Sequence, residues 1–430
     1  MKYRMFVIVC VMFAMLVTGC APAAAPAPAA DAPTAEAAAP AADAPTAEAA
    51  APAAEGAPEA CAADAAGCAV IPAGQTVKIG MGGPMTGDYA MFGVDISNGA
   101  KIAVLDAGEV EGFKFELVAQ DTQGSPEIGA TVANKFVTDP TVVAIAGHIF
   151  SGETEAAMPI YEKASIPMLS PSATNPPLTE LGSKVFNRIA FTDKVQGEAA
   201  AAYLKDKLGF AKIAVIHDGS AYGKGLADVV KDTFTAAGGE VVEYQAINPG
   251  EVDYSATLSA VAAKKPEAIY FGGYSSEAIV MINQLKQTGL KDVVFFGCDG
   301  TYGQDVLDKT GENGVGAYSA SVIPPASDAK TKFDADHEKA YGQKAGVLSP
   351  YTWSGYDVTA ALTSVIKSVA VKGADGSLYV PRTALVAAVR GMKGYQGITG
   401  DITCNETGEC NTAGPTFYVI KDGQWVEAEK

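Results

Sequence analysis

Short groups of hydroxyl-bearing and aromatic residues, most of them beside glycines, recur along this 430-residue chain. They lie at 82–87 (GGPMTG), 147–152 (GHIFSG), 170–174 (SPSAT), 217–223 (HDGSAYG), 272–274 (GGY) and 297–300 (GCDG). Hydroxyls and a carboxylate bind the charged ends of a small molecule through hydrogen bonds, and aromatic rings cover an apolar body. The mixture suits a zwitterion with an apolar body better than it suits a nucleotide.

Catalytic signatures are missing from the sequence. It contains no Gly-x-Ser-x-Gly elbow, no Gly-x-x-x-x-Gly-Lys-Ser/Thr loop, no Gly-x-Gly-x-x-Gly opening a helix and no His-Glu-x-x-His. The only histidines are His148, His217 and His337, and no cysteine pair has metal-ligand spacing. We therefore expect neither an enzyme nor a cofactor or metal site.

Strand and helix patterns alternate through the chain and place these groups just after strands. The first series has apolar strands at 76–81, 113–119, 142–146 and 167–170, with helical periodicity at 93–107, 127–137 and 153–163. A second series begins after residue 193 and runs to about 296, and helices return past about 322 before two final strands near 397–404 and 416–420. Continuous apolar strands are typical of parallel sheets covered on both faces. The pattern predicts an α/β fold with two doubly wound sheets, whose ligands bind beyond the carboxyl ends of the strands.

The first residues predict export. Lys2 and Arg4 precede an apolar run at 5–17, which is too short for a bilayer span, and a Val-Thr-Gly-Cys sequence ends at Cys20. We expect a signal peptide over 1–19 and lipidation of Cys20, with an uncleaved short anchor as the alternative. The protein would then sit on the outer face of the cytoplasmic membrane, held by the lipid anchor only.

Residues 20–75 predict an extended acidic tether. From 21 to 75 there is no Lys or Arg, and the twelve residues PAADAPTAEAAA at 28–39 are repeated at 40–51. With few large apolar side chains such a segment cannot offset its ordering entropy. The net charge of −18 argues against nucleic acid and against anionic lipid as partners.

Cysteine spacing predicts two local disulfides in an oxidising compartment. Cys61 and Cys68 form one candidate pair near the end of the tether, and Cys404 and Cys410 form the other. Cys298 is left over, and we interpret it as a small buried thiol rather than a nucleophile.

A family resemblance adds to this interpretation. The segments GPMTGDYAMFG (83–93), AGHIFSGET (146–154), SPSATNPPLT (170–179), VIHDGSAYGKGLA (215–227), AIYFGGYSSEA (268–278) and FGCDG (296–300) resemble the extracytoplasmic binding proteins of branched-chain amino acid ABC importers. The resemblance implies the type I periplasmic binding fold, a monomeric clamp of two Rossmann-like lobes joined by crossover hinge strands. It places residues 76–193 and 323–397 in the first lobe, and 194–322 and 398–430 in the second. It also implies a permease and an ATPase as partners.

The resemblance further implies roles for individual residues. The α-carboxylate would lie at Ser151 and the following helix start, and Thr174 and the Ser172 carbonyl would bind the amino acid backbone. Asp299 would bind the ammonium group. The remaining ligand-binding residues it implies are Ala173, Tyr222, Tyr274, Phe92, Phe150 and Tyr351.

Each of these residues also has a purely structural interpretation. Ser151 can cap the following helix, Thr174 and Asp299 can be turn residues, and Tyr222 and Tyr274 can be aromatic residues at the edge of a core. Phe150 is large for its place and is expected to narrow the pocket. The identity of the ligand stays open: relatives of this kind also bind amides, urea or aromatic acids, and a sensory ligand-binding ectodomain is the rival function.

Overall fold

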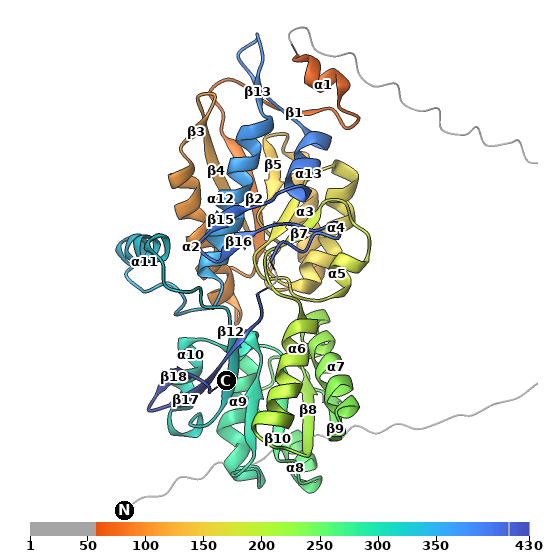
Figure 1. Ribbon diagram of the computed structural model, residues 1–430, viewed down its shortest axis with the longest axis vertical. Coiled ribbons are helices and arrows are strands. Elements are labelled where there is room, and N and C mark those ends of the chain that lie inside the picture. Colours follow the sequence, from red (N-terminus) through yellow and green to blue (C-terminus); the bar gives the residue numbers. More distant parts are fainter. Residues whose placement is uncertain (1–56, 412, 430) are drawn as a thin grey trace, which may run out of the picture. The chain divides into compact units, whose positions relative to one another are not determined.

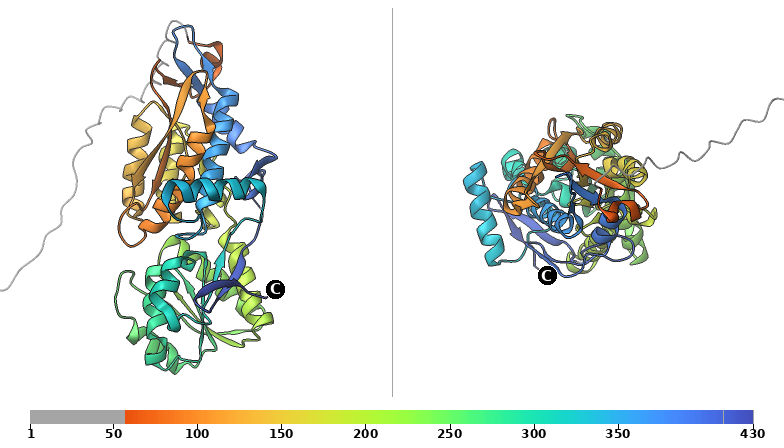
Figure 2. Two further views of the ribbon diagram at one scale, coloured as in Figure 1. Left: turned by 90° about the vertical axis from the view of Figure 1, so that its left-hand side faces the viewer. Right: turned by 90° about the horizontal axis from the view of Figure 1, so that it is seen from above.

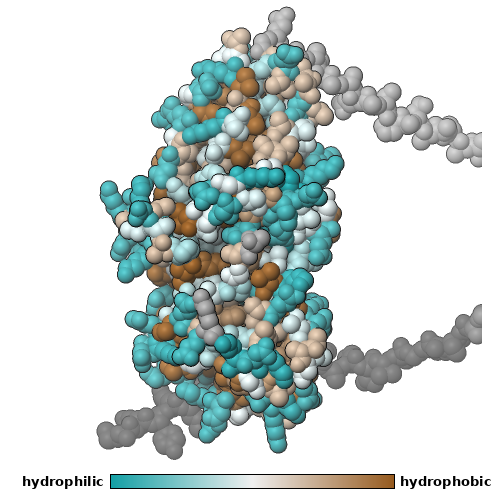
Figure 3. Space-filling model, viewed as in Figure 1, coloured by the Kyte–Doolittle hydropathy of each residue, from teal (hydrophilic) through white to brown (hydrophobic). Residues whose placement is uncertain are grey.

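The computed structural model describes residues 57–411 and 413–429. The predicted signal peptide, Cys20 and the tether up to residue 56 lie outside the described residues. Within the described residues no helix has the length and apolar character needed to cross a bilayer. Hydrophilic side chains cover most of the face shown in Figure 3, and apolar ones reach that surface only in small groups.

The first lobe is built on a sheet whose strands run in the order β3-β4-β2-β5-β6-β7, parallel except for the β3–β4 pair. The strands are β2 (Val77–Gly83), β3 (Glu109–Val110), β4 (Phe113–Asp121), β5 (Val142–Ile145), β6 (Met168–Ser170) and β7 (Phe186–Arg188). Its helices are α2 (Ala90–Ala107), α3 (Pro126–Thr138), α4 (Ser151–Ala164), α5 (Pro177–Glu180), α12 (Thr352–Val369) and α13 (Arg382–Arg390).

Two helical layers cover the two faces of this sheet (Figure 1). Helix α12 packs on α2, and α3 packs on α4. Ile79, Ile96 and Leu362 belong to the core cluster on the α2–α12 side, and Phe136 and Ile145 belong to the cluster on the α3–α4 side. Burial on both faces explains why the central strands are continuous apolar runs.

The second lobe has a seven-stranded sheet in the order β18-β17-β12-β11-β10-β8-β9. The strands are β8 (Lys212–His217), β9 (Glu240–Ala246), β10 (Ala268–Gly272), β11 (Val294–Gly297), β12 (Tyr318–Ser321), β17 (Thr416–Lys421) and β18 (Gln424–Glu427). The helices are α6 (Asp193–Ala202), α7 (Ala221–Ala236), α8 (Ser255–Ala263), α9 (Ser275–Gln284) and α10 (Gln304–Thr310). A π-helical turn, Tyr203–Lys207, continues α6. Strands β8 to β12 are parallel, and β17 and β18 extend the sheet as an antiparallel hairpin.

The chain crosses between the two sheets after β7, after β12 and again before β17, as the colours in Figures 1 and 2 show. After β12 it forms helix α11 (Asp328–Tyr341) and then α12. The predicted boundary between the lobes at residue 397 falls inside a hairpin, which is formed by β15 (Tyr395–Gly397) and β16 (Gly400–Ile402). Its turn amides at Ile398 and Thr399 donate to Asp357 of α12, which anchors the whole hairpin to the first lobe.

The folded part also begins before Thr76, where the tether was expected to end. Helix α1 (Glu59–Ala63) precedes β1 (Cys68–Ile71), which pairs with β14 (Leu378–Pro381), and β14 pairs in turn with β13 (Val371–Lys372). Ala69 and Ile71 are buried in this small sheet. Disulfides join Cys61 to Cys68 and Cys404 to Cys410.

Candidate ligand-binding site

A small cavity lies where the carboxyl ends of the strands of the two sheets face each other. Its volume is about 20 Å³, and it is lined by Phe92, Ile149, Phe150, Ser151, Ser172, Tyr222, Tyr274, Asp299, Gly300 and Tyr351. The structure therefore brings together all of the predicted ligand-binding residues except Ala173 and Thr174. These two are fully buried in the loop directly after Ser172.

The first lobe contributes the N-terminus of helix α4 to this cavity. Ser151 is the first residue of the helix, and no side chain caps the helix end. The first amide groups of a helix have no partner within it, so they favour an anionic group placed at that end. The Ser151 hydroxyl accepts from the Asn175 amide at 3.2 Å, and the Ser172 hydroxyl donates to the Ile149 carbonyl at 2.8 Å.

The second lobe contributes a buried carboxylate, Asp299. It follows β11, and its side chain accepts hydrogen bonds from Gln196 Nε2 at 2.6 Å and from the Tyr222 hydroxyl. The Tyr351 hydroxyl, which comes from the first lobe, donates to the other carboxylate oxygen at 2.6 Å. Burial and then the charge of Asp299 raise the pKa of both tyrosines, so their hydroxyls stay protonated donors.

A buried arginine holds the loop that carries Thr174. The Arg188 side chain is fully buried in β7 and donates to the carbonyls of Ala173 and Asn175 at 3.0 and 2.7 Å. Its remaining donors reach both carboxylate oxygens of Glu409, at 3.0 and 2.6 Å. The carbonyls on either side of Thr174 are therefore fixed by one guanidinium group.

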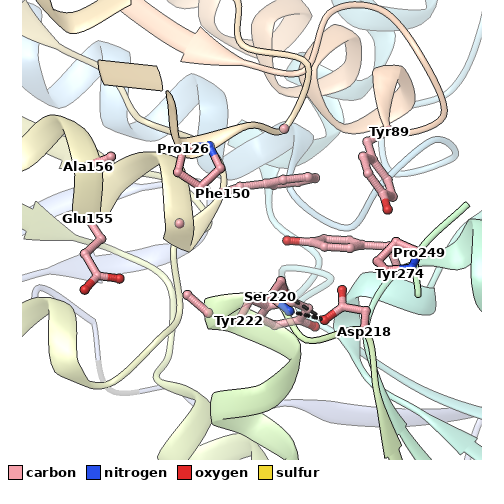
Figure 4. Close-up of a pocket in the computed structure, with 13 residues that line it drawn as sticks. Tyr89, Pro126, Phe150, Glu155, Ala156, Asp218, Ser220, Tyr222, Pro249 and Tyr274 are labelled. Carbon is pink, nitrogen blue, oxygen red and sulfur yellow. Dashed lines mark hydrogen bonds between the residues drawn. The ribbon is translucent and has the colours of Figure 1, made fainter. Parts of the chain in front are cut away.

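Aromatic rings from both lobes form a further part of the cavity wall. Phe150 from the first lobe stacks on Tyr274 from the second, with ring centroids 4.4 Å apart and an angle of 19° between the planes. Phe92 meets both rings edge-on, and Tyr89 lies 5.0 Å from Tyr274. Beyond the stack lies a second, outer cavity of about 570 Å³, shown in Figure 4.

Comparison with known proteins agrees with this geometry. The chain matches the protein family described as "periplasmic binding protein" over residues 76–424. The chain belongs to this family. A leucine-, isoleucine-, valine-, threonine- and alanine-binding protein of Pseudomonas aeruginosa is 32% identical over 349 residues, which cover 80% of this chain and 90% of that protein. The family is one of extracytoplasmic substrate-binding proteins, so this member acts outside the cytoplasm by binding a solute.

Solved structures show the same fold. The leucine-binding protein LivK of Thermotoga maritima superposes with a TM-score of 0.74 at 28% identity, covering 82% of this chain and 98% of that one. The branched-chain amino acid transporter substrate-binding protein LivJ of Streptococcus pneumoniae, in complex with isoleucine, gives 0.72 at 25% identity and covers 82% and 100%. The periplasmic binding protein described here therefore has the type I fold with two lobes.

Behind Ser151 this binding protein buries a histidine–glutamate pair. His148 Nδ1 lies 3.9 Å from Glu153 Oε2, and both side chains are wholly buried. Burial lowers the pKa of His148 to about 3 and raises that of Glu153 to about 8. Both groups are therefore neutral near pH 7, and the pair adds no charge beside the helix end.

Asp193 is a second buried carboxyl group close to the cavity, and sequence reasoning missed it. Its amide donates to the Thr174 carbonyl at 2.9 Å. No hydrogen bond of normal geometry joins the two side chains, but the Thr174 hydroxyl lies close enough to the Asp193 carboxyl group to oppose the effect of burial on its pKa. Burial and then the charge of Asp299 raise the pKa of Asp193, so it is held as the neutral acid. An acidic residue at the start of a helix is usually explained by the helix dipole, so nothing in its sequence context marks Asp193 as a group near the cavity.

The buried thiol near the cavity is that of Cys298. Among the described residues, no group of three or more His, Cys, Asp or Glu side chains has metal-ligand geometry. The Cys298 thiol is buried, accepts from the Tyr222 hydroxyl at 3.0 Å and donates to the Gly273 carbonyl at 3.1 Å. Burial raises the pKa of Cys298, which keeps the thiol protonated.

Proposed function

We propose that this protein captures a small α-amino acid, branched-chain and aliphatic in type, between its lobes and delivers it to an ABC importer. The observation that carries the proposal is that one cavity contains both a site for an anionic group and a site for a cationic group. The uncapped N-terminus of α4 lies on the first lobe, and the Asp299 carboxylate faces it from the second. A zwitterion presents its carboxylate to the first and its ammonium group to the second, so it bridges the lobes.

The surrounding groups complete the recognition of the amino acid backbone. Ser151 and the first amides of α4 bind the carboxylate, and the loop 172–174 supplies a carbonyl at Ser172 and the hydroxyl of Thr174. The Thr174 hydroxyl is fully buried beside the Asp193 carboxyl group and is a hydroxyl donor for the ligand carboxylate. The rings of Phe92, Phe150 and Tyr274 form the apolar wall for the side chain. The two relatives named as binding leucine or several aliphatic amino acids support this choice of ligand.

Binding acts by stabilising the closed clamp. The Tyr351–Asp299 hydrogen bond and the Phe150–Tyr274 stack both join the lobes, so closure has favourable contacts of its own. A ligand that touches both lobes binds the closed form more tightly than the open one and shifts the population toward it. The closed form is the one that docks on the permease, and an ATPase supplies the energy for transport. Cys20, lipidated after removal of residues 1–19, tethers the clamp to the membrane.

Replacement of Asp299 tests the proposal. Loss of a charge-assisted hydrogen bond costs about 1.5–3 kcal/mol, so Asp299→Ala should raise the Kd for leucine or valine about 10- to 150-fold in calorimetric titration of the full chain. Asp308→Ala removes an exposed carboxylate from the same lobe and serves as the control. Unchanged affinity in Asp299→Ala would show that Asp299 does not bind the ammonium group, and it would contradict the proposed ligand class.

A further inference from the structure

The Phe150 ring lines the small cavity that also contains Ser151 and Asp299. The residue directly precedes helix α4 and is only 8% exposed. Its ring stacks on Tyr274, and the edges of the Phe92 and Tyr89 rings meet it at centroid distances of 5.7 and 5.8 Å. Three aromatic neighbours therefore surround this one ring.

The same ring divides the space between the lobes into two compartments. Phe150, Tyr222 and Tyr274 line both the inner cavity of about 20 Å³ and the outer cavity of about 570 Å³. Figure 4 shows the Phe150 and Tyr274 rings at the inner limit of the outer cavity. The inner cavity has room for about one water molecule. No amino acid enters a space of this size unless these rings move apart, and a longer side chain requires a larger displacement.

Gly124, at φ +75°, lies beside the Phe150 ring. A Cβ added there would be in ordinary van der Waals contact, 3.5 Å, with two ring carbons of Phe150. Each aromatic pair adds a favourable interaction beyond the burial of its area. A ligand that displaces Phe150 must therefore replace the contacts of its ring with three other rings. A ligand with a short side chain leaves most of these contacts in place.

We propose that Phe150 is a specificity-determining residue that makes the clamp prefer short aliphatic side chains, those of alanine and valine, over those of isoleucine and leucine. The inference rests on the proposed function, because it takes the amino acid backbone to lie between Ser151 and Asp299. Within the aliphatic amino acids it shifts the preferred ligand from the longer branched side chains to that of valine and to the unbranched side chain of alanine. The atoms that limit the length of the ligand side chain belong to Phe150 alone, so truncating Phe150 should allow longer side chains to bind.

The test measures the ratio of two dissociation constants in one protein. Alanine, valine, isoleucine and leucine are titrated calorimetrically into the full chain and into Phe150→Ala. The wild-type protein should bind alanine and valine more tightly than isoleucine and leucine, and Phe150→Ala should shift the ratio of Kd(Ala) to Kd(Leu) about tenfold or more in favour of leucine. A general loss of closure changes all four constants together and leaves the ratio unchanged, so the ratio isolates the steric effect.

Phe113→Ala is the matched control, because it truncates a buried phenylalanine of the same lobe at the opposite end of the sheet. It should leave the ratio unchanged. Phe150→Leu, a smaller truncation, replaces Phe150→Ala if circular dichroism shows that the alanine variant is unfolded. Wild-type binding of leucine as tight as that of alanine, or an unchanged ratio in the Phe150 variant, overturns the inference alone. Absence of binding by all four amino acids overturns the proposed function and this inference with it.

Discussion

Glu409→Ala should destabilise the first lobe strongly, although Glu409 lies near the protein surface. Arg188, its partner, is wholly buried and has no other charged group as a hydrogen-bond acceptor among the described residues. After the substitution the guanidinium group keeps only the carbonyls of Ala173 and Asn175 and the Thr179 hydroxyl. A buried cation would then remain without a counter-charge.

The expected size of the effect follows from the burial of the pair. Removing one member of a buried ion pair costs about 3–5 kcal/mol. The Glu409 side chain is 19% exposed, so water can partly replace it, and the lower end, about 3 kcal/mol, is expected. The exposed pair Lys194–Glu198, with side chains 62% and 48% exposed, supplies the contrast. Glu198→Ala should cost less than about 1 kcal/mol.

Urea unfolding followed by tryptophan fluorescence measures this difference. The two tryptophans, Trp353 and Trp425, lie in different lobes, so a Trp425→Phe background leaves Trp353 as a reporter of the first lobe alone. A loss of about 3 kcal/mol lowers the urea midpoint by about 1 M or more. If Glu409→Ala shifts the midpoint no further than Glu198→Ala does, the account of Arg188 as a buried cation that depends on Glu409 is refuted.

Two further predictions concern the buried groups around the cavity. The pKa of Glu153 is raised from 4.5 to about 8 in the fold, so its contribution to stability is present below about pH 4.5 and is lost as the pH rises through 8. Glu153→Gln should therefore show a smaller fall in unfolding free energy between pH 5 and 8 than the wild type in urea titrations, and an equal fall would contradict the burial of an uncharged acid. Tyr351→Phe removes the donor that joins the first lobe to Asp299. The ligand-free variant should have a larger radius of gyration in small-angle X-ray scattering and about tenfold weaker ligand binding. Unchanged scattering and affinity would show that this bond does not hold the lobes together.

Much of the fold can be predicted from the sequence because its central strands are buried on both faces. Strands such as β5 and β10 are short apolar runs with a glycine at or just after their end, and the helices after them have regular periodicity. The short strands β7 and β12 escaped prediction, since Phe-Asn-Arg and Tyr-Ser-Ala-Ser have no apolar run. Their polar residues are buried through partners that lie far away in the sequence, as Arg188 is by Glu409.

The candidate site divides in the same way. Residues in the segments just after strands, such as Ser151, Tyr274 and Asp299, can be found from sequence because the carboxyl ends of parallel strands converge. Asp193 and Gln196 cannot, since they lie on a helix and reach the cavity region only through the crossing of the chain between the lobes. Gln196 bonds both the amide and the carboxylate of Asp299, yet its sequence context is that of an ordinary helix residue.

The most direct test of the central claim is calorimetric titration of the full chain with a panel of small solutes. The panel contains leucine, isoleucine, valine, alanine, phenylalanine, glutamate, urea and acetamide. Our account predicts saturable binding of the aliphatic amino acids, with a negative heat-capacity change as their side chains are buried against the aromatic wall. Binding confined to phenylalanine, glutamate, urea or acetamide, or no binding by any member of the panel, would contradict it.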